Sequence, residues 1–177
     1  MATWLTIPEG EPAFELVDGA LIQKMSPRRR HAIVQGELLL AIASWARGRG
    51  DAGTEWRFRI SDGAKRHALV PDVAYVAIER LRALRDDEQR EEPPFAPDLA
   101  VEVLSPGDDR AVLALKIAAY LRCGAKVVLV ADPLGCSVAL HDTDRVREFN
   151  RHDRIEHHAF PGLVIDLGAV FAALDRR

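Results

Sequence analysis

The chain has 177 residues and a mass of 19.6 kDa, with 48% hydrophobic and 29% charged residues. This length predicts a single domain over residues 1–177, which would bury roughly 70% of its unfolded surface and fold without disulfides or a structural metal. The 24 basic and 27 acidic residues give a net charge of −3, which excludes a strongly basic nucleic-acid coat and a polybasic membrane binder but leaves local basic patches open.

The first part of the chain predicts a hairpin, a helix and a strand. An Asp-Gly turn at 18–19 separates two short apolar runs within 14–22, which is typical of a β-hairpin. Residues 31–46 place apolar side chains at helical spacing and predict an amphipathic helix, whose end is marked by glycines at 48 and 50. Residues 54–60 alternate between apolar and polar side chains and predict a half-exposed strand.

The middle of the chain predicts three strands and a second helix. Apolar runs at 69–78 and 98–108 each contain one internal acid and indicate strands, and 126–131 is typical of a buried strand. Residues 109–122 predict a helix with an apolar side. The polar stretch 79–96 is either a substrate flap or a solvated connection with a short helix.

The last part of the chain predicts a second hairpin and a terminal helix. Two alternating runs, 136–142 and 145–151, are separated by a polar turn and indicate a hairpin. Residues 160–174 predict a strand or extended segment followed by a short helix. This order of elements indicates a mixed α/β domain built around one central sheet.

The sequence also carries signals about the compartment. The first residues, MATWLTIPEGEP, lack the basic and apolar regions of a signal peptide, and no stretch approaches 18 continuous apolar residues. Cys123 and Cys136 lack the spacing of a zinc site. We therefore expect a cytoplasmic protein with reduced cysteines and no membrane association.

Two acidic residues interrupt apolar runs that predict buried strands. Asp72 lies within VPDVAYV (70–76), and Glu102 within LAVEVL (99–104). A carboxylate in such a run is costly unless a metal, a cation or hydrogen bonds compensate it. If the two acids share a face on neighbouring strands, they would repel each other and attract a divalent cation. The alternative is a pair of independent acids at strand ends, each paired with an arginine.

Lys116 is one of only four lysines among the 24 basic residues. It lies one helical turn from Val112 and from Tyr120, both on the apolar side of the predicted helix. That helix begins a few residues after Glu102, so Lys116 could point at the two acids. The alternative is a lysine on the flank of the helix that extends its ammonium group to solvent.

These segments together resemble the Uma2 family, which belongs to the PD-(D/E)xK nuclease superfamily. The resemblance rests on PDVAYV (71–76), PDLAVEVLSPGDD (97–109), Lys116 with Tyr120, and VVLVADP (127–133), flanked by FELVDGALI (14–22) and FPGLVIDLGAVFA (160–172). It covers roughly residues 13–173. It implies a restriction-endonuclease-like α/β core (mixed α+β), with a central mixed sheet flanked by helices, an N-terminal hairpin and a C-terminal hairpin.

Carried over residue by residue, the resemblance implies a metal site. Asp72 matches the first metal-binding aspartate of the superfamily and Glu102 the second acid, and the backbone carbonyl of Val103 falls where a further metal ligand often lies. The third motif position departs from the pattern because it holds Leu104 instead of lysine. In this family the lysine stands on the following helix, and Lys116 matches that place.

Several further residues have two interpretations each. Glu37 is the candidate for a glutamate on the first helix that completes such sites, or it is a surface residue. His31 either faces the site or makes a hydrogen bond at the start of the helix, and Tyr120 is an accessory candidate. Asp98, which also follows a proline, is interpreted as a turn residue at the start of a strand, and Glu15 as structural.

Two functions are compatible with this pattern. The first is an endonuclease that hydrolyses phosphodiester bonds of DNA with Mg²⁺ or Mn²⁺ on Asp72 and Glu102, while Lys116 orients water or stabilises phosphoryl charge. The second is a catalytically idle protein of the same fold that acts as a dimeric binding or structural partner.

A run of three arginines precedes the first helix. Arg28, Arg29 and Arg30 either contact backbone phosphates or form a solvated face. The expected partners are DNA and a second copy of the chain in a homodimer.

Overall fold

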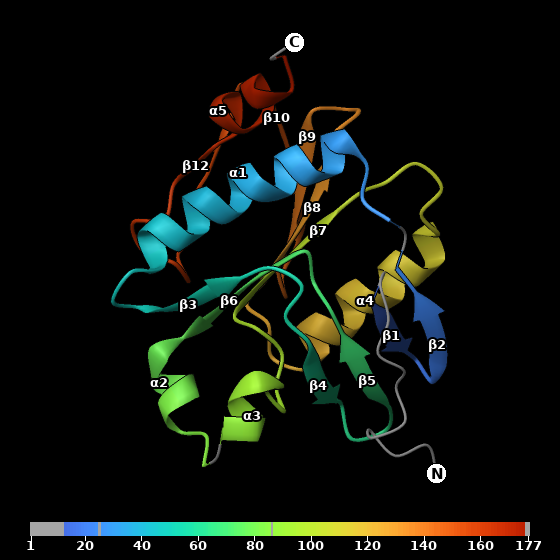
Figure 1. The fold of residues 1–177 in the computed structure, drawn as a ribbon. Helices are drawn as coiled ribbons and strands as arrows, with labels where there is room; N and C mark the ends of the chain where they lie inside the picture. Colours follow the sequence, from blue (N-terminus) through green and yellow to red (C-terminus); the bar gives the residue numbers. More distant parts are fainter. Residues whose placement is uncertain (1–12, 25, 86, 176–177) are drawn as a thin grey trace.

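A six-stranded sheet, with strand order β10-β9-β8-β7-β6-β3, forms the centre of the molecule (Figure 1). The computed structural model describes residues 13–24, 26–85 and 87–175. Strands β7 and β8 are parallel and every other neighbouring pair in this sheet is antiparallel, so the sheet is mixed. Its strands are β3 (Gly50–Gly53), β6 (Val73–Ala77), β7 (Leu99–Val103), β8 (Val127–Asp132), β9 (Ser137–His141) and β10 (Val146–Asn150).

Four shorter strands form a second sheet in the order β2-β1-β5-β4. They are β1 (Phe14–Val17), β2 (Ala20–Gln23), β4 (Phe58–Ser61) and β5 (Arg66–Leu69). The predicted hairpin is confirmed: Asp18 and Gly19 both have positive φ, as a two-residue hairpin turn requires. The predicted central mixed sheet is confirmed, and the C-terminal hairpin, β9–β10, belongs to it, whereas the N-terminal hairpin belongs to this separate sheet.

The predicted strand over 69–78 is divided between the two sheets. Leu69 ends β5 in the four-stranded sheet, and Val73 begins β6 in the six-stranded sheet. Pro71 lies between them and has no N–H to donate to a strand ladder, so the chain leaves one sheet and enters the other at this point. Asp72 therefore lies at the junction of the sheets, directly before β6.

Strand β3 was not predicted. The glycines at 48 and 50 were interpreted as the end of a helix, and that helix, α1, does end at Ala46. Gly50, however, pairs with Ala77 at the edge of the central sheet. A Cβ atom at this position would collide with the carbonyl oxygen of Val76, so the close approach of β3 to β6 requires glycine.

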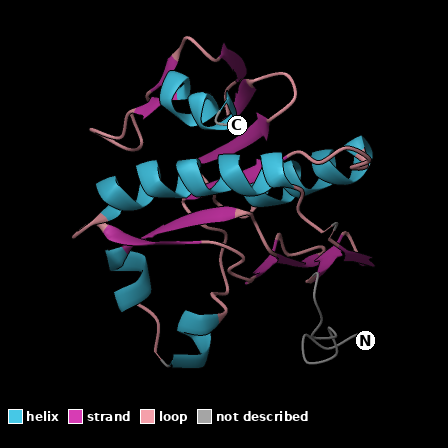
Figure 2. Ribbon diagram, turned by 45° about the horizontal axis from the view of Figure 1, so that its top comes forward, coloured by secondary structure: helices cyan, strands magenta, loops and turns pink. Residues whose placement is uncertain are grey.

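The two long helices pack on opposite faces of the central sheet. Helix α1 (Arg29–Ala46), the long helix across the middle of Figure 2, packs against alternate strand residues that include Val73 and Val101. Helix α4 (Arg110–Arg122) packs against the residues between them, such as Ala74 and Ala100. Because side chains alternate between the faces of a strand, Asp72 and Glu102 point to the α4 side.

The remaining elements are short. The polar stretch after β6 forms α2 (Ile78–Arg82) and α3 (Asp87–Glu91), as expected for a connection with helical turns. The chain ends with β11 (Arg154–Ile155), β12 (Ile165–Asp166), α5 (Leu167–Ala172) and the 3₁₀ helix η2 (Ala173–Asp175). Both cysteines are free thiols. Within residues 13–24, 26–85 and 87–175, no helix has the length and apolar character to cross a membrane.

Candidate active site

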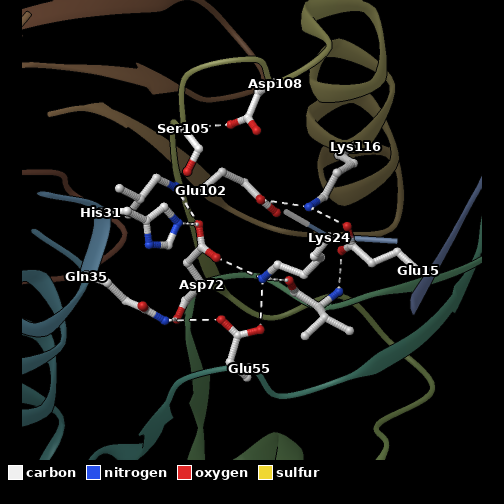
Figure 3. A network of polar contacts seen from close by, with 12 residues as sticks. Glu15, Lys24, His31, Gln35, Glu55, Asp72, Glu102, Ser105, Asp108 and Lys116 are labelled. Atoms are coloured by element: carbon white, nitrogen blue, oxygen red, sulfur yellow. Dashed lines mark hydrogen bonds and ion pairs between the residues drawn. The ribbon is translucent and has the colours of Figure 1, made fainter. Parts of the chain in front are cut away.

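The structure brings Asp72 and Glu102 to one cavity. The antiparallel register pairs Val73 with Val101, so the next positions outward, Asp72 and Glu102, lie opposite each other on the α4 side. Both line a cavity of about 250 Å³, and they are only 3% and 6% exposed. The sequence pattern had predicted this shared position, and Figure 3 shows the two side chains close together.

Helix α4 holds Glu102 through two residues that are one turn apart. The Lys116 ammonium donates to Oε2 of Glu102 at 2.7 Å, and the Tyr120 hydroxyl donates to Oε1 at 2.9 Å. The helix is set in place by Asp109, whose side chain accepts from the backbone N–H groups of Ala111 and Val112. Lys116 is 6% exposed and ion-paired, so the interpretation of a lysine that reaches out to solvent is wrong.

Glu15 also belongs to the cavity, although the sequence had suggested only a structural role. Its Oε2 accepts from the Lys116 ammonium at 2.9 Å, and its Oε1 accepts from the Val70 N–H at 2.7 Å. Glu15 thus connects β1, the segment before Asp72 and α4. The one local signal is its position in FELV, where the alternation places Glu15 on the same side as the buried Val17.

Lys24, which follows β2, pairs with Asp72 and was not predicted. Its ammonium donates to Oδ1 of Asp72 at 2.8 Å, to Oε2 of Glu55 at 2.9 Å and to the Val70 carbonyl at 3.0 Å. These contacts use all three N–H groups of Lys24, whereas Lys116 uses two in its contacts with Glu15 and Glu102. With respect to the described residues, Lys116 therefore retains a donor for another acceptor in the cavity.

Helix α1 contributes His31 and Gln35 to the site, which lie one helical turn apart on the same face of the helix. His31 Nε2 lies 3.3 Å from Oδ2 of Asp72, and the Gln35 amide donates to the Asp72 carbonyl at 2.9 Å and to Glu55 at 3.2 Å. Asp72 Oδ2 also accepts from the backbone N–H of Val103 at 2.6 Å. Of the two interpretations of His31, the structure supports the one that faces the site.

Glu55, which accepts hydrogen bonds from Lys24 and Gln35, has an unusual backbone conformation. Its φ of 53° lies in the left-handed region that is rare for residues with a side chain. In this conformation its carboxylate reaches both Lys24 and Gln35 (Figure 3). Such strain is often found beside functional sites.

Other candidates lie outside the cavity. Among the described residues, Glu37 is not part of the lining, and the α1 positions that reach the site are His31 and Gln35. Arg28 flanks the start of α1 and Arg30 donates to the Pro133 carbonyl at 3.5 Å. All three arginines, at 28–30, are exposed and precede His31, close to the cavity but outside its lining.

The surroundings of Asp72 and Glu102 shift the pKa values of these two acids in opposite directions. Burial would raise the pKa of Asp72, but the hydrogen bond with His31 and the Lys24 ammonium hold that pKa below its ordinary value. Burial raises the pKa of Glu102 to about 7 in spite of the Lys116 ammonium, and the carboxylates of Glu15 and Asp72 contribute in the same direction. Asp72 is thus a persistent anion, and Glu102 holds a proton more readily.

The lysine and the tyrosine remain protonated. Burial would lower the pKa of Lys116, but the carboxylates of Glu102 and Glu15 more than offset it and raise this pKa above its ordinary value. Burial, with Glu102 nearby, raises the pKa of the Tyr120 hydroxyl well above its ordinary value. Both groups therefore remain donors to Glu102 at neutral pH.

The charged groups around the cavity bear on whether it could hold a divalent cation. Three buried carboxylates, Glu15, Asp72 and Glu102, face two buried ammonium groups, Lys24 and Lys116, so ionisation of all five leaves an excess of negative charge. No group of three or more His, Cys, Asp or Glu residues that could hold a metal occurs in the described part of the chain. Mg²⁺ keeps several waters and binds through one or two protein carboxylates plus phosphate oxygens, so the paired carboxylates of Asp72 and Glu102 are the chain's candidates to hold it.

Known proteins resemble this chain in sequence and in fold. A crystal structure of "a putative nuclease belonging to DUF820 from Anabaena variabilis ATCC 29413" matches with a TM-score of 0.85 and 25% sequence identity, over 97% of this chain and 96% of that chain. No curated protein matches the sequence. The model of the Uma2 family, described as "Putative restriction endonuclease", matches residues 2–168. The chain therefore belongs to the Uma2 family and shares the fold of that "putative nuclease".

Proposed function

We propose that the protein is a divalent-metal-dependent endonuclease that hydrolyses phosphodiester bonds of DNA. The observation that carries the proposal is the position of Asp72 and Glu102, opposite each other in one cavity, with the Lys116 ammonium on Glu102. Membership of the Uma2 family supports the same chemistry.

Each residue has a role in this proposal. Asp72, Glu102 and the Val103 carbonyl would hold Mg²⁺ or Mn²⁺, which when bound supplies Lewis-acid polarisation of the scissile phosphate. Lys116 would place its remaining N–H against a non-bridging phosphoryl oxygen, where negative charge develops. Tyr120 and Glu15 orient Glu102 and Lys116 through the contacts that they make here.

The reaction is a hydrolysis with a simple balance. A water oxygen forms a bond to phosphorus, one phosphorus–oxygen ester bond breaks, and the proton lost by the water is taken up by the departing sugar oxygen. Once Glu102 is ionised, the carboxylates of Glu15, Asp72 and Glu102 outnumber the ammonium groups of Lys24 and Lys116. This excess supports the need for a cation, because a phosphate is not stabilised by excess negative charge.

A cleavage assay tests the proposal. Wild-type protein should convert DNA to shorter products with Mg²⁺ or Mn²⁺ and none in excess EDTA. Glu102→Gln should lower the rate by about 10³-fold or more, because it removes one of the two carboxylates that would hold the metal. Glu148→Gln, an exposed acid on β10, is the matched control and should cleave like wild type. Cleavage that persists in EDTA, or in Glu102→Gln at the control rate, contradicts the proposal.

A second candidate is a catalytically idle partner protein, and one observation favours it. Both oxygens of Asp72 already have donors within the chain, from Lys24, His31 and Val103. A cation at this position has to share Asp72 with the Lys24 ammonium. An idle site would bind no Mn²⁺ and cleave no nucleic acid, so the same assay separates the two candidates. The homodimer and the cytoplasmic location remain predictions.

A further inference from the structure

We propose that the cavity admits one nucleotide of an unpaired strand, so that the substrate is single-stranded or locally unpaired nucleic acid and not a continuous duplex. This inference rests on the proposed nuclease function and specifies its substrate. It follows from the depth of the reacting groups, the size of the cavity and the nature of its walls.

The groups that would act on phosphate lie at the floor of the cavity. The side chains of Asp72, Glu102 and Lys116 are only 4%, 8% and 7% exposed. A scissile phosphate must come within contact distance of these groups, and it therefore has to enter the cavity. The phosphates of a regular duplex follow a stiff double helix, so one of them cannot move into a narrow cavity without its neighbours, whereas an unpaired strand can turn a single unit inward.

The cavity has room for little more than one such unit. Its volume is about 250 Å³, below the ≈ 300–1,000 Å³ of pockets that enclose drug-sized ligands. Three segments form the wall: the end of β2 with Ile22, the loop that carries Ser105, and the first turns of α4 with Val112 and Leu113. A duplex would meet these walls before its phosphate reached Glu102.

The walls suit a base and a sugar better than a row of phosphates. Ile22, Val112 and Leu113 offer apolar contacts to a base face, and Ser105 adds a hydroxyl. Asp108 and Asp109 also line the cavity, and both side chains are held in place, Asp108 by the Ser105 N–H at 2.7 Å and Asp109 by the first turn of α4. These two fixed acids would repel the flanking phosphates of a duplex lying across the opening.

Three DNA substrates of shared sequence test the inference with Mn²⁺: a single strand, a relaxed and covalently closed circular duplex, and a linear duplex with one unpaired tail. Wild-type protein should cleave the single strand at least about 10-fold faster than the closed duplex, as expected when unpairing is required. In the tailed duplex, the cuts should fall within the tail or at its junction.

Filling the cavity supplies the matched test. Leu113→Trp places a large ring in the wall, whereas Leu115→Trp changes a 41% exposed leucine of the same helix that is not part of the lining. Leu113→Trp should abolish cleavage of the single strand and Leu115→Trp should not. Gln23→Ala, which enlarges the opening at β2, should keep the fold even if Leu113→Trp does not, and should raise the rate on the closed duplex relative to the single strand.

The outcomes separate the two proposals. Equal rates on the closed duplex and the single strand would overturn the inference and leave the nuclease function standing. Full activity of a folded Leu113→Trp variant, or an unchanged substrate ratio in Gln23→Ala, would also overturn the inference. A wild-type protein that cleaves none of the three substrates would overturn the nuclease function and, with it, this inference.

Discussion

Asp72 and Asp98 are two buried aspartates that look alike in the sequence. Each follows a proline and directly precedes a strand, β6 or β7. Because these strands are antiparallel, the two acids lie at opposite ends of the same strand pair. They are 3% and 1% exposed, and each contacts two basic side chains.

The surroundings of the two acids differ. Asp98 accepts from Arg80 at 3.1 Å, from Lys126 at 3.1 Å and from the Ala77 N–H at 2.9 Å, and it is not part of the lining of the Asp72 cavity. Its basic partners are 29% and 50% exposed. Asp72 instead faces a second carboxylate, Glu102, across a cavity. Burial and pairing are therefore common to both acids, and the opposed carboxylate and the cavity are what make Asp72 the candidate for a functional site.

The largest expected difference concerns activity. Asp72→Asn should reduce DNA cleavage by about 10³-fold or more, because it removes an anion that would hold the metal. Asp98→Asn should cleave like wild type per folded molecule. Both variants should lower the free energy of unfolding, by about 3 kcal/mol, because each leaves buried or half-buried cations without their anion. Cleavage rates test the predicted activities, and urea denaturation tests the predicted loss of stability. Loss of cleavage in a folded Asp98→Asn variant would show that Asp98 also contributes to activity.

Lys116, beside Glu102, and Lys126, beside Asp98, should also differ in their effect on activity. Lys116→Met should lower cleavage by about 10²-fold, because methionine keeps the apolar stem and removes only the charge at the phosphate. Lys126→Met, at the Asp98 end, should retain the wild-type rate. Mn²⁺ affinity should persist or increase in Lys116→Met, since the ammonium competes for Glu102. Wild-type cleavage by Lys116→Met would remove this residue from the mechanism.

Glu102 should give the protein an unusual pH dependence. The pKa of Glu102 is raised from 4.5 to about 7 in the folded state. Between pH 4.5 and 7 the unfolded chain therefore releases this proton while the folded chain keeps it. The free energy of unfolding of the wild type consequently falls as the pH rises through this interval. Glu102→Gln removes this loss. We expect the variant to match wild type near pH 4.5 and to be more stable at pH 8, by on the order of 1–3 kcal/mol. Melting curves across this range check the sign, and a destabilised variant at pH 8 would assign Glu102 to a structural ion pair.

Salt should produce the smallest difference. The partners of Asp98 are partly exposed, so the destabilisation by Asp98→Asn should shrink by a few tenths of a kcal/mol between low and high NaCl concentration. Asp72 and Lys24 are shielded from solvent, with side-chain exposures of 4% and 14%, so the effect of Asp72→Asn should change less. Urea titrations at two salt concentrations measure both, and an equal salt response would mean that the two environments do not differ in solvent access.

Local patterns predicted much of the fold. The Asp-Gly turn, the helical spacing of α1 and α4 and the apolar runs of β7 and β8 reflect contacts between residues close in sequence, so their periodicity is visible directly. The division of 69–78 at Pro71 was missed because both of its halves are buried and apolar. Strand β3 was missed because a glycine that allows two strands to approach closely cannot be distinguished in the sequence from a glycine that ends a helix.

The site was predictable only in part. Asp72 and Glu102 stood out because a carboxylate inside an apolar run needs compensation. Their partners did not stand out, since Lys116 and Glu15 are 101 residues apart and Lys24 and Asp72 are 48 apart. Contacts over such separations are created by the packing of the two sheets and leave no periodic signal.

Asp72 and Glu102 are proposed to hold a divalent cation in the cavity between them. Crystals soaked in Mn²⁺ and measured for anomalous scattering show whether they do, with crystals of Glu102→Gln as the control. Wild-type crystals should have one strong anomalous peak in contact with the carboxylates of Asp72 and Glu102, and crystals of the variant should have none there. A wild-type map without a peak at this position, with the Lys24 ammonium still on Asp72, would rule out the proposed metal site.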